Sequence, residues 1–140
     1  MNYAKSMLMP LFVNSNFSFG LGAQVDKEVK FLIEDGRKAI AEAKEENKYG
    51  DIANDLTQTE GEPDASERHD LTVIAVWHYE RGIEKYREAV KYLKIAAAHD
   101  LPEKYEKYIT LQIKEAEKQL NIILEQKNSI KDLQEEVLAA

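Results

Sequence analysis

Residues 69–99, HDLTVIAVWHYERGIEKYREAVKYLKIAAAH, decide the fold, because they contain no proline and repeat apolar side chains at helical spacing. Steps of four and three residues are typical of the apolar seam of a long amphipathic helix that packs against another helix. The seam consists of Thr72, Val76, Tyr79, Ile83, Tyr86, Val90, Leu93 and Ala97. A stripe of small residues at heptad spacing comprises Ala75, Gly82, Ala89 and Ala96. Such a stripe leaves a groove for another backbone, so we expect these four positions at an interface.

Further helices are predicted on both sides of this segment. Apolar residues at helical spacing begin at position 25, and Gly50 stands where a C-terminal cap is typical, so the first helix is expected to end near Lys48. After a turn at residues 100–103, a last helix has the seam Ile109, Ile113, Ala116, Leu120 and Ile123. The short turn requires an antiparallel hairpin. The last helix either breaks at residues 128–129 or continues, and we favour a continuous helix.

The start of the central helix carries its own signal. Asp64 is followed three residues later by Glu67, the spacing of a capping box, in which the two side chains satisfy amide groups of the first turn. Residues 57–63 before it are polar and contain glycine and proline, so they are predicted to form a surface loop.

Residues 1–24 differ from the rest of the chain. Short apolar pieces alternate with polar residues and end in Gly20-Leu21-Gly22, which predicts an extended arm rather than a helix. We expect the arm to dock on the bundle or on a neighbouring subunit through Phe12, Phe17 and Phe19. The prediction is therefore an all-α fold. It has a non-helical arm (1–24) and a bundle domain (25–140) of three long helices, with a short fourth helix if the last one breaks.

Composition and charge exclude several classes of protein. The net charge of −7 arises from residues 42–70, which contain ten acidic and three basic residues (3 − 10 = −7). No basic face typical of nucleic-acid binding is present, so no nucleic-acid partner is expected. No apolar run reaches the roughly 18 residues of a membrane span, so we expect a cytoplasmic protein without membrane contact. The absence of cysteine excludes disulfides and thiol nucleophiles.

Two acidic pairs are candidates for a metal site. Glu67 and Asp70 share one helix face, and Glu42 and Glu45 form a second pair on another helix. Carboxylate oxygens are the ligands that Mg²⁺ prefers. These pairs resemble the site of the all-α nucleoside triphosphate pyrophosphohydrolases of the MazG type. The resemblance implies that the four acids hold magnesium, which binds a triphosphate and activates water. Alternatively, Glu67 only caps a helix and the other acids are solvated.

Tyrosines beside basic residues form a second candidate site on the hairpin. The candidate ligand-binding residues are Tyr86, Tyr92, Tyr105, Tyr108, Arg87 and Lys91. Aromatic rings and cations can bind a nucleotide or another small anionic ligand. The alternative is that the rings belong to the core and only their hydroxyl groups reach the surface.

A catalytic constellation is not found in the sequence. The three histidines lack the glutamate three positions earlier that a di-iron bundle needs, and no phosphate-binding glycine loop is present. We therefore favour a non-catalytic interaction or assembly protein without a cofactor, which self-associates as a homo-oligomer or captures a protein partner. The magnesium-dependent pyrophosphohydrolase and the binder of a small anionic ligand are the alternatives.

Overall fold

The structure, a computed structural model, describes residues 27–59 and 64–139, with side chains described as far as residue 132. Within these ranges the chain forms three α-helices and no strand: α1 (Lys27–Thr57), α2 (Ala65–Ala97) and α3 (Glu103–Ala139). The predicted all-α fold with three long helices is thereby confirmed. The expected arm, with Phe12, Phe17 and Phe19, lies outside the described residues.

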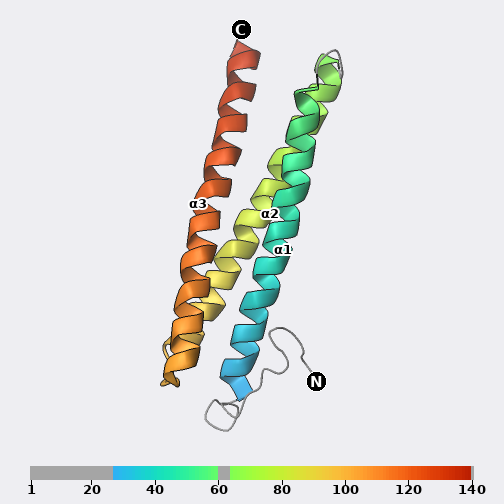
Figure 1. Cartoon of the computed structure of the whole chain (residues 1–140). Coiled ribbons are helices and arrows are strands. Elements are labelled where there is room, and N and C mark those ends of the chain that lie inside the picture. Colours follow the sequence, from blue (N-terminus) through green and yellow to red (C-terminus); the bar gives the residue numbers. More distant parts are fainter. Residues whose placement is uncertain (1–26, 60–63, 140) are drawn as a thin grey trace.

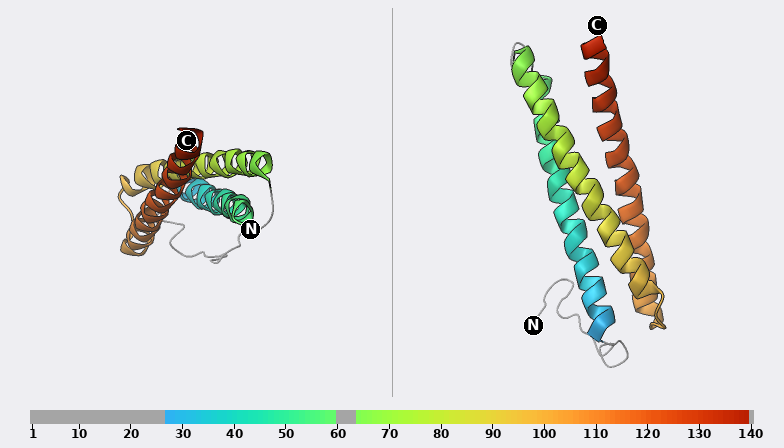
Figure 2. Two further views of the ribbon diagram at one scale, coloured as in Figure 1. Left: turned by 90° about the horizontal axis from the view of Figure 1, so that it is seen from above. Right: turned by 180° about the vertical axis from the view of Figure 1, so that it is seen from behind.

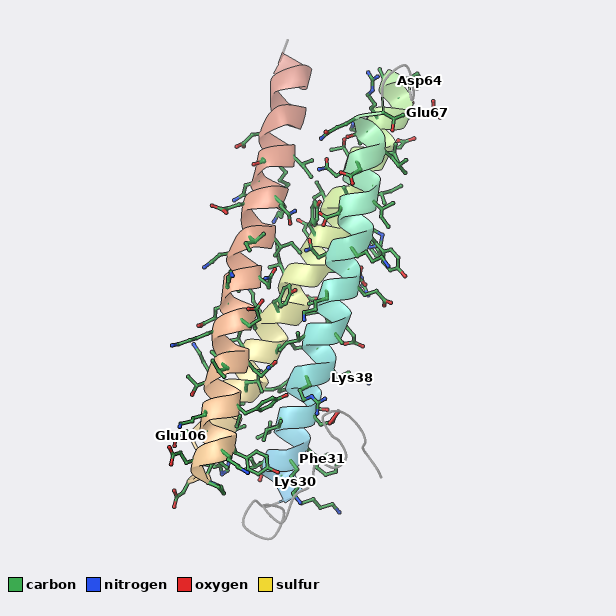
Figure 3. The ribbon with its side chains drawn as sticks, viewed as in Figure 1. Lys30, Phe31, Lys38, Asp64, Glu67 and Glu106 are labelled. Atoms are coloured by element: carbon green, nitrogen blue, oxygen red, sulfur yellow. The ribbon has the colours of Figure 1, made fainter. Side chains whose placement is uncertain are left out.

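The helix α2 begins with the predicted capping box. Asp64 Oδ1 accepts a hydrogen bond from the backbone N–H of Glu67 at 2.9 Å, and Glu67 Oε1 accepts one from the N–H of Asp64 at 3.2 Å. These bonds satisfy amide donors that a helix start leaves without intrahelical partners. Figure 3 shows both residues at the end of the bundle opposite Phe31.

The helix α1 does not end near Lys48, and this prediction is wrong. It continues through Gly50 to Thr57, and Gly50 is buried. A Cβ atom at Gly50 would lie 2.6 Å from Cε1 of Tyr79, so this glycine allows α1 to approach a ring of α2. The glycine therefore serves a close contact between helices rather than a C-terminal cap.

The helix α3 is continuous from Glu103 to Ala139, which confirms the favoured alternative at residues 128–129. Lys127, which interrupts the apolar seam, forms a salt bridge with Glu80 of α2: its Nζ lies 3.4 Å from Oε2 of that residue. The apolar pattern resumes at Ile130, which is buried. No fourth helix is present in the part of the chain that the structure describes.

The arrangement of the helices makes α2 the central element. α1 and α2 run antiparallel side by side over nearly their whole length (Figure 1). α3 lies against the C-terminal half of α2 and separates from the other two helices toward its own C-terminus, as the view of Figure 1 and the view from behind in Figure 2 show. α1 and α3 contact each other little. None of the three helices, over the residues described, is both long and apolar enough to cross a membrane.

The core is built from buried apolar residues of all three helices. The buried residues on the predicted seam of α2 are Tyr79, Ile83, Tyr86 and Leu93, while Thr72, Val76 and Val90 are partly buried and Ala97 is exposed. The helix α3 contributes a heptad row, Ile109, Ala116, Ile123 and Ile130, that packs onto this seam. The helical period read from the sequence thus identifies most of the core.

Candidate functional site

The acidic pairs expected to hold magnesium do not come together. Glu42 Oε1 lies 3.3 Å from Nζ of Lys85 on α2. Glu67 precedes Lys85 by eighteen residues on the same helix, or about 27 Å along the axis. Glu45 and Asp70 are exposed, and no group of three metal-ligating side chains lies close enough to hold an ion in the described part of the chain. The geometry therefore does not form the site that the pyrophosphohydrolase resemblance implies.

The tyrosines expected to bind an anion differ in their surroundings. Tyr86 is buried, and its pKa is raised by burial and by the negative charge of Glu115 on α3. Tyr108 of α3 instead faces α1, where burial raises its pKa and the charge of Arg37 opposes that rise. Burial raises the pKa of Tyr105 to about 12. Tyr86 and Tyr105 are core groups and Tyr108 packs, partly buried, against the core, in agreement with the alternative that the sequence left open.

The remaining candidates of that set are on the surface of α2. Arg87 and Lys91 are exposed and lie one turn apart, on one side of the helix. Tyr92 is half-buried and lies about 100° round the helix from Lys91. Tyr86 and Tyr105 are buried instead, so the candidate residues divide between the core and the surface. The ligand site on the hairpin stays a prediction.

The small residues of α2 are part of the core. Ala75, Ala89 and Ala96 are fully buried, and Gly82 is buried with them. A Cβ atom at Gly82 would lie 2.7 Å from Cδ1 of Ile123 and 3.4 Å from the carbonyl oxygen of Ala43. At Gly82 the neighbours are therefore a side chain of α3 and the backbone of α1, both from the same chain. This corrects the expectation that the four positions face another molecule.

A polar junction links all three helices beside this stripe. Asp51 Oδ1 on α1 accepts a hydrogen bond from the hydroxyl of Tyr79 at 2.6 Å and one from Nε2 of Gln126 on α3 at 3.1 Å. Burial raises the pKa of Tyr79, and the hydrogen bond and charge of Asp51 raise it further. The phenol thus remains a neutral donor, which suits a structural role.

On the outer side of α1 and α2, a carboxylate joins two side chains of α2. Glu46 Oε1 lies 2.7 Å from Nδ1 of His78, and its Oε2 lies 3.2 Å from Nε of Arg81. Burial acts to raise the pKa of Glu46, but the hydrogen bonds and charges of His78 and Arg81 hold that pKa below its ordinary value. The carboxylate therefore remains ionised and balances the positive charge beside it.

Two exposed aromatic rings flank this bridge. The centroid of the His78 ring lies 5.5 Å from that of Tyr49 on α1 and 4.8 Å from that of Trp77, to which it is nearly perpendicular. The guanidinium of Arg81 lies over the ring of Trp77, 4.8 Å from its centroid. Tyr49 and Trp77 are nevertheless 45% and 53% exposed, so each presents about half of its surface to solvent.

Large aliphatic side chains extend this aromatic surface toward the loop between α1 and α2. The contacts of Glu46 with His78 and of Gly50 with Tyr79 set an antiparallel register that places Ile52 level with Ile74. We call the resulting surface the outer patch and define it as Tyr49, Ile52, Leu56, Ile74 and Trp77, which are 45–53% exposed.

The outer patch was not predicted from the sequence, although a signal was present. Tyr49, Ile52 and Leu56 follow one another at spacings of three and four residues, and so do Ile74, Trp77 and Arg81. Each series forms a second row of side chains along its helix, beside the apolar row that is buried in the core. Only the register of α1 on α2 shows that the two second rows lie on one surface.

Comparison with known proteins identifies no relative of this chain. No family model, no curated protein and no solved structure matches it significantly. The functional argument therefore rests on the geometry of the outer patch.

Proposed function

We propose that this chain is a non-catalytic interaction or assembly protein and that the outer patch is its docking surface. The observation that carries the proposal is that five large apolar side chains, each about half exposed, gather on one face of the α1–α2 pair. At about 200 Å² for a fully exposed large side chain, they present roughly 480 Å² of surface. Patches of that size on soluble proteins are often functional.

The kinds of residue in the outer patch support the same proposal. Tryptophan, tyrosine and arginine are enriched among the residues that carry most of the energy of protein interfaces. Here Trp77, Tyr49 and Arg81 lie together, and ring contacts through His78 hold them in a defined arrangement. A pre-ordered aromatic surface loses little side-chain entropy when it is covered by a partner.

Site-specific crosslinking in cells that produce the protein tests this proposal. A photoreactive phenylalanine derivative in place of Ile52, within the outer patch, should form protein adducts on illumination. The matched control carries the same group in place of Leu111 on α3, which is 65% exposed and lies outside the patch. Adducts from position 52 but not from position 111 would support a docking surface. Equal yields, or none at position 52, would contradict it.

The proposal also includes a cytoplasmic location, which rests on the sequence expectation. We do not extend the proposal to a magnesium-dependent hydrolase or to a binder of a small anion. In the described residues, Glu42 of the first lies beside Lys85, about 27 Å along α2 from Glu67. Of the tyrosines of the second, Tyr86 and Tyr105 belong to the core. A docking surface is the function that the geometry supports best.

A further inference from the structure

We infer that the partner of the outer patch is a cationic amphipathic helix of another protein, with apolar side chains on one face and lysine or arginine beside them. This inference rests on the proposed function and names the chemistry of the partner for the same surface. Three features carry it: the negative charge around the patch, the spacing of its apolar side chains, and the area that it presents.

The negative charge of the chain is concentrated at the end of the α1–α2 pair that bears the outer patch. Residues 51–70 contain seven acidic residues and one basic residue (1 − 7 = −6). Ile52 and Leu56 lie within this segment, and the rest of the chain carries a charge of only −1 (−7 + 6 = −1). A partner that covers the patch therefore enters a negative potential, which attracts cationic surfaces and repels anionic ones.

Two exposed acids border the patch directly. Glu45 lies one helical turn before Tyr49 on α1, and Asp70 lies one turn before Ile74 on α2. Glu46, between the two helices, is paired with bases of α2. Glu45 and Asp70 are therefore the acids placed to receive positive side chains at the edges of a bound helix.

The spacing of the exposed apolar residues favours a helix as the partner. Tyr49, Ile52 and Leu56 recur at three and four residues on α1, and Ile74 and Trp77 are three residues apart on α2. Rows of side chains at this spacing fit between the rows of another helix. An amphipathic helix that binds an apolar surface anchors residues at the same intervals. One such helix covers both rows of the patch.

The area of the outer patch fits a contact with a single helix. Its five side chains, each about half exposed, present roughly 480 Å² at about 200 Å² per fully exposed large side chain. Together with the share of the partner, the contact buries on the order of 1,000 Å², which is the range of transient complexes. We therefore expect a dissociation constant in roughly the micromolar range.

The test is a titration of the purified full chain, whose single tryptophan is Trp77 of the patch. The probe, called the lysine peptide, is a synthetic amphipathic helix of about four turns with leucine on one face and lysine on the other. Because Trp77 is half exposed, its emission should shift to shorter wavelength when the peptide covers it. The glutamate peptide, with glutamate in place of lysine, should bind more weakly by about tenfold or more, because like charges repel.

Removal of charge tests the two bordering acids. Glu45→Gln combined with Asp70→Asn should weaken binding of the lysine peptide by about fivefold at low salt, as expected for two exposed charge pairs. Glu106→Gln combined with Glu125→Gln removes the same charge from exposed positions on α3 and should weaken binding much less. Figure 3 shows Glu106 at the end of the bundle opposite the start of α2.

A second pair of variants, matched in charge, tests the apolar contact. Ile52→Arg keeps the fluorescent reporter and should raise the dissociation constant of the lysine peptide by about 30-fold or more, as expected at the centre of an interface. Leu111→Arg adds the same charge at an exposed position on α3 and should change the constant by less than about fivefold. Circular dichroism verifies helix content, and Leu56→Arg replaces Ile52→Arg if that variant does not fold.

Several outcomes would overturn the inference. Equal binding of the two peptides would exclude a cationic partner, and lysine-peptide binding that Ile52→Arg does not weaken would place the contact elsewhere on the acidic surface. A chain alone that sediments above 16.0 kDa, and as a monomer after Ile52→Arg, would make a second copy the occupant. Binding only after deletion of residues 1–24 would assign the patch to that segment. If the lysine peptide fails but position 52 still crosslinks to other proteins in cells, the docking function stands and only the chemistry of the partner fails.

Discussion

Gly50 illustrates at the residue scale how closely α1 and α2 pack. Replacement by alanine gains about 1 kcal/mol of intrinsic helix propensity. The added Cβ would overlap the ring of Tyr79, which full burial and the hydrogen bond to Asp51 hold in place. We expect Gly50→Ala to lower the free energy of unfolding by about 1–2 kcal/mol, because overpacking outweighs the propensity. Unfolding in urea measures the change.

Gly82 provides the matched comparison for this change. A Cβ atom there would lie 2.7 Å from Cδ1 of Ile123, the far end of a flexible side chain, and 3.4 Å from backbone. Gly82→Ala should therefore cost less free energy of unfolding than Gly50→Ala. Equal stability of Gly50→Ala and the unchanged protein would show that the ring of Tyr79 moves aside easily.

At the scale of the element, the capping box sets the start of α2. Removal of the Asp64 carboxylate leaves the N–H of Glu67 without its hydrogen-bond acceptor. Asp64→Ala should lower the free energy of unfolding by about 1 kcal/mol and the melting temperature by about 3–5 °C. Calorimetry measures both values.

The control for the cap is Asp70→Ala, an exposed position further along the same helix, where the change should stay within about 0.5 kcal/mol. Glu67→Ala tests the other interpretation of these acids. A magnesium-dependent stabilisation of the unchanged protein that Glu67→Ala abolishes would contradict a purely capping role for Glu67.

The packing of α3 on the other two helices depends on Ile123. Ile123 is fully buried and packs at Gly82, where α1, α2 and α3 come together. Ile123→Ala should lower the free energy of unfolding by about 2–5 kcal/mol, because it leaves a cavity at this junction. Amide hydrogen exchange should accelerate first in the C-terminal half of α3, while the α1–α2 pair stays protected.

The neighbouring residue supplies the control for Ile123. Ile122 is 37% exposed on the same turn, so Ile122→Ala should change exchange in α3 much less. Faster exchange spread evenly over all three helices in Ile123→Ala would show that α3 does not open separately.

For the whole molecule, we expect the buried tyrosine hydroxyl groups to lower the free energy of unfolding at high pH. Burial raises the pKa values of Tyr79, Tyr86, Tyr105 and Tyr108 above their ordinary value of 10.0, to about 12 for Tyr105. Below pH 10 the phenols are protonated in both the folded and the unfolded chain. Above it the unfolded chain loses protons that the folded chain keeps, so the free energy of unfolding falls as pH rises from 10 to 12.

Tyr105→Phe should make this alkaline loss of stability less steep, by at most about 1.4 kcal/mol per pH unit, the maximum for one proton. The measurement is the free energy of unfolding from urea titrations at successive pH values, monitored by circular dichroism. An unchanged slope in Tyr105→Phe would show that this phenol does not contribute to the transition.

Much of the fold could be predicted because its causes are local. The seam through Tyr79, Ile83 and Leu93 repeats at the period of one helix, and the Asp64–Glu67 box lies within four residues. The interpretation of Gly50 failed because a glycine near a helix end can serve a cap or a close contact. Only the position of Tyr79 on another helix distinguishes the two roles.

The candidate site was less predictable, because it depends on the register in which α1 packs against α2. The sequence by itself determined three helices, their core faces and the start of α2, since periodicity and capping act within a few turns. The tertiary structure alone decided the rest. Packing Gly50 against Tyr79 sets the register that separates Glu42 from Glu67, buries the small stripe of α2 and leaves Trp77 on the outer patch. That register arises from interdigitation of side chains distant in the sequence, which no local pattern encodes.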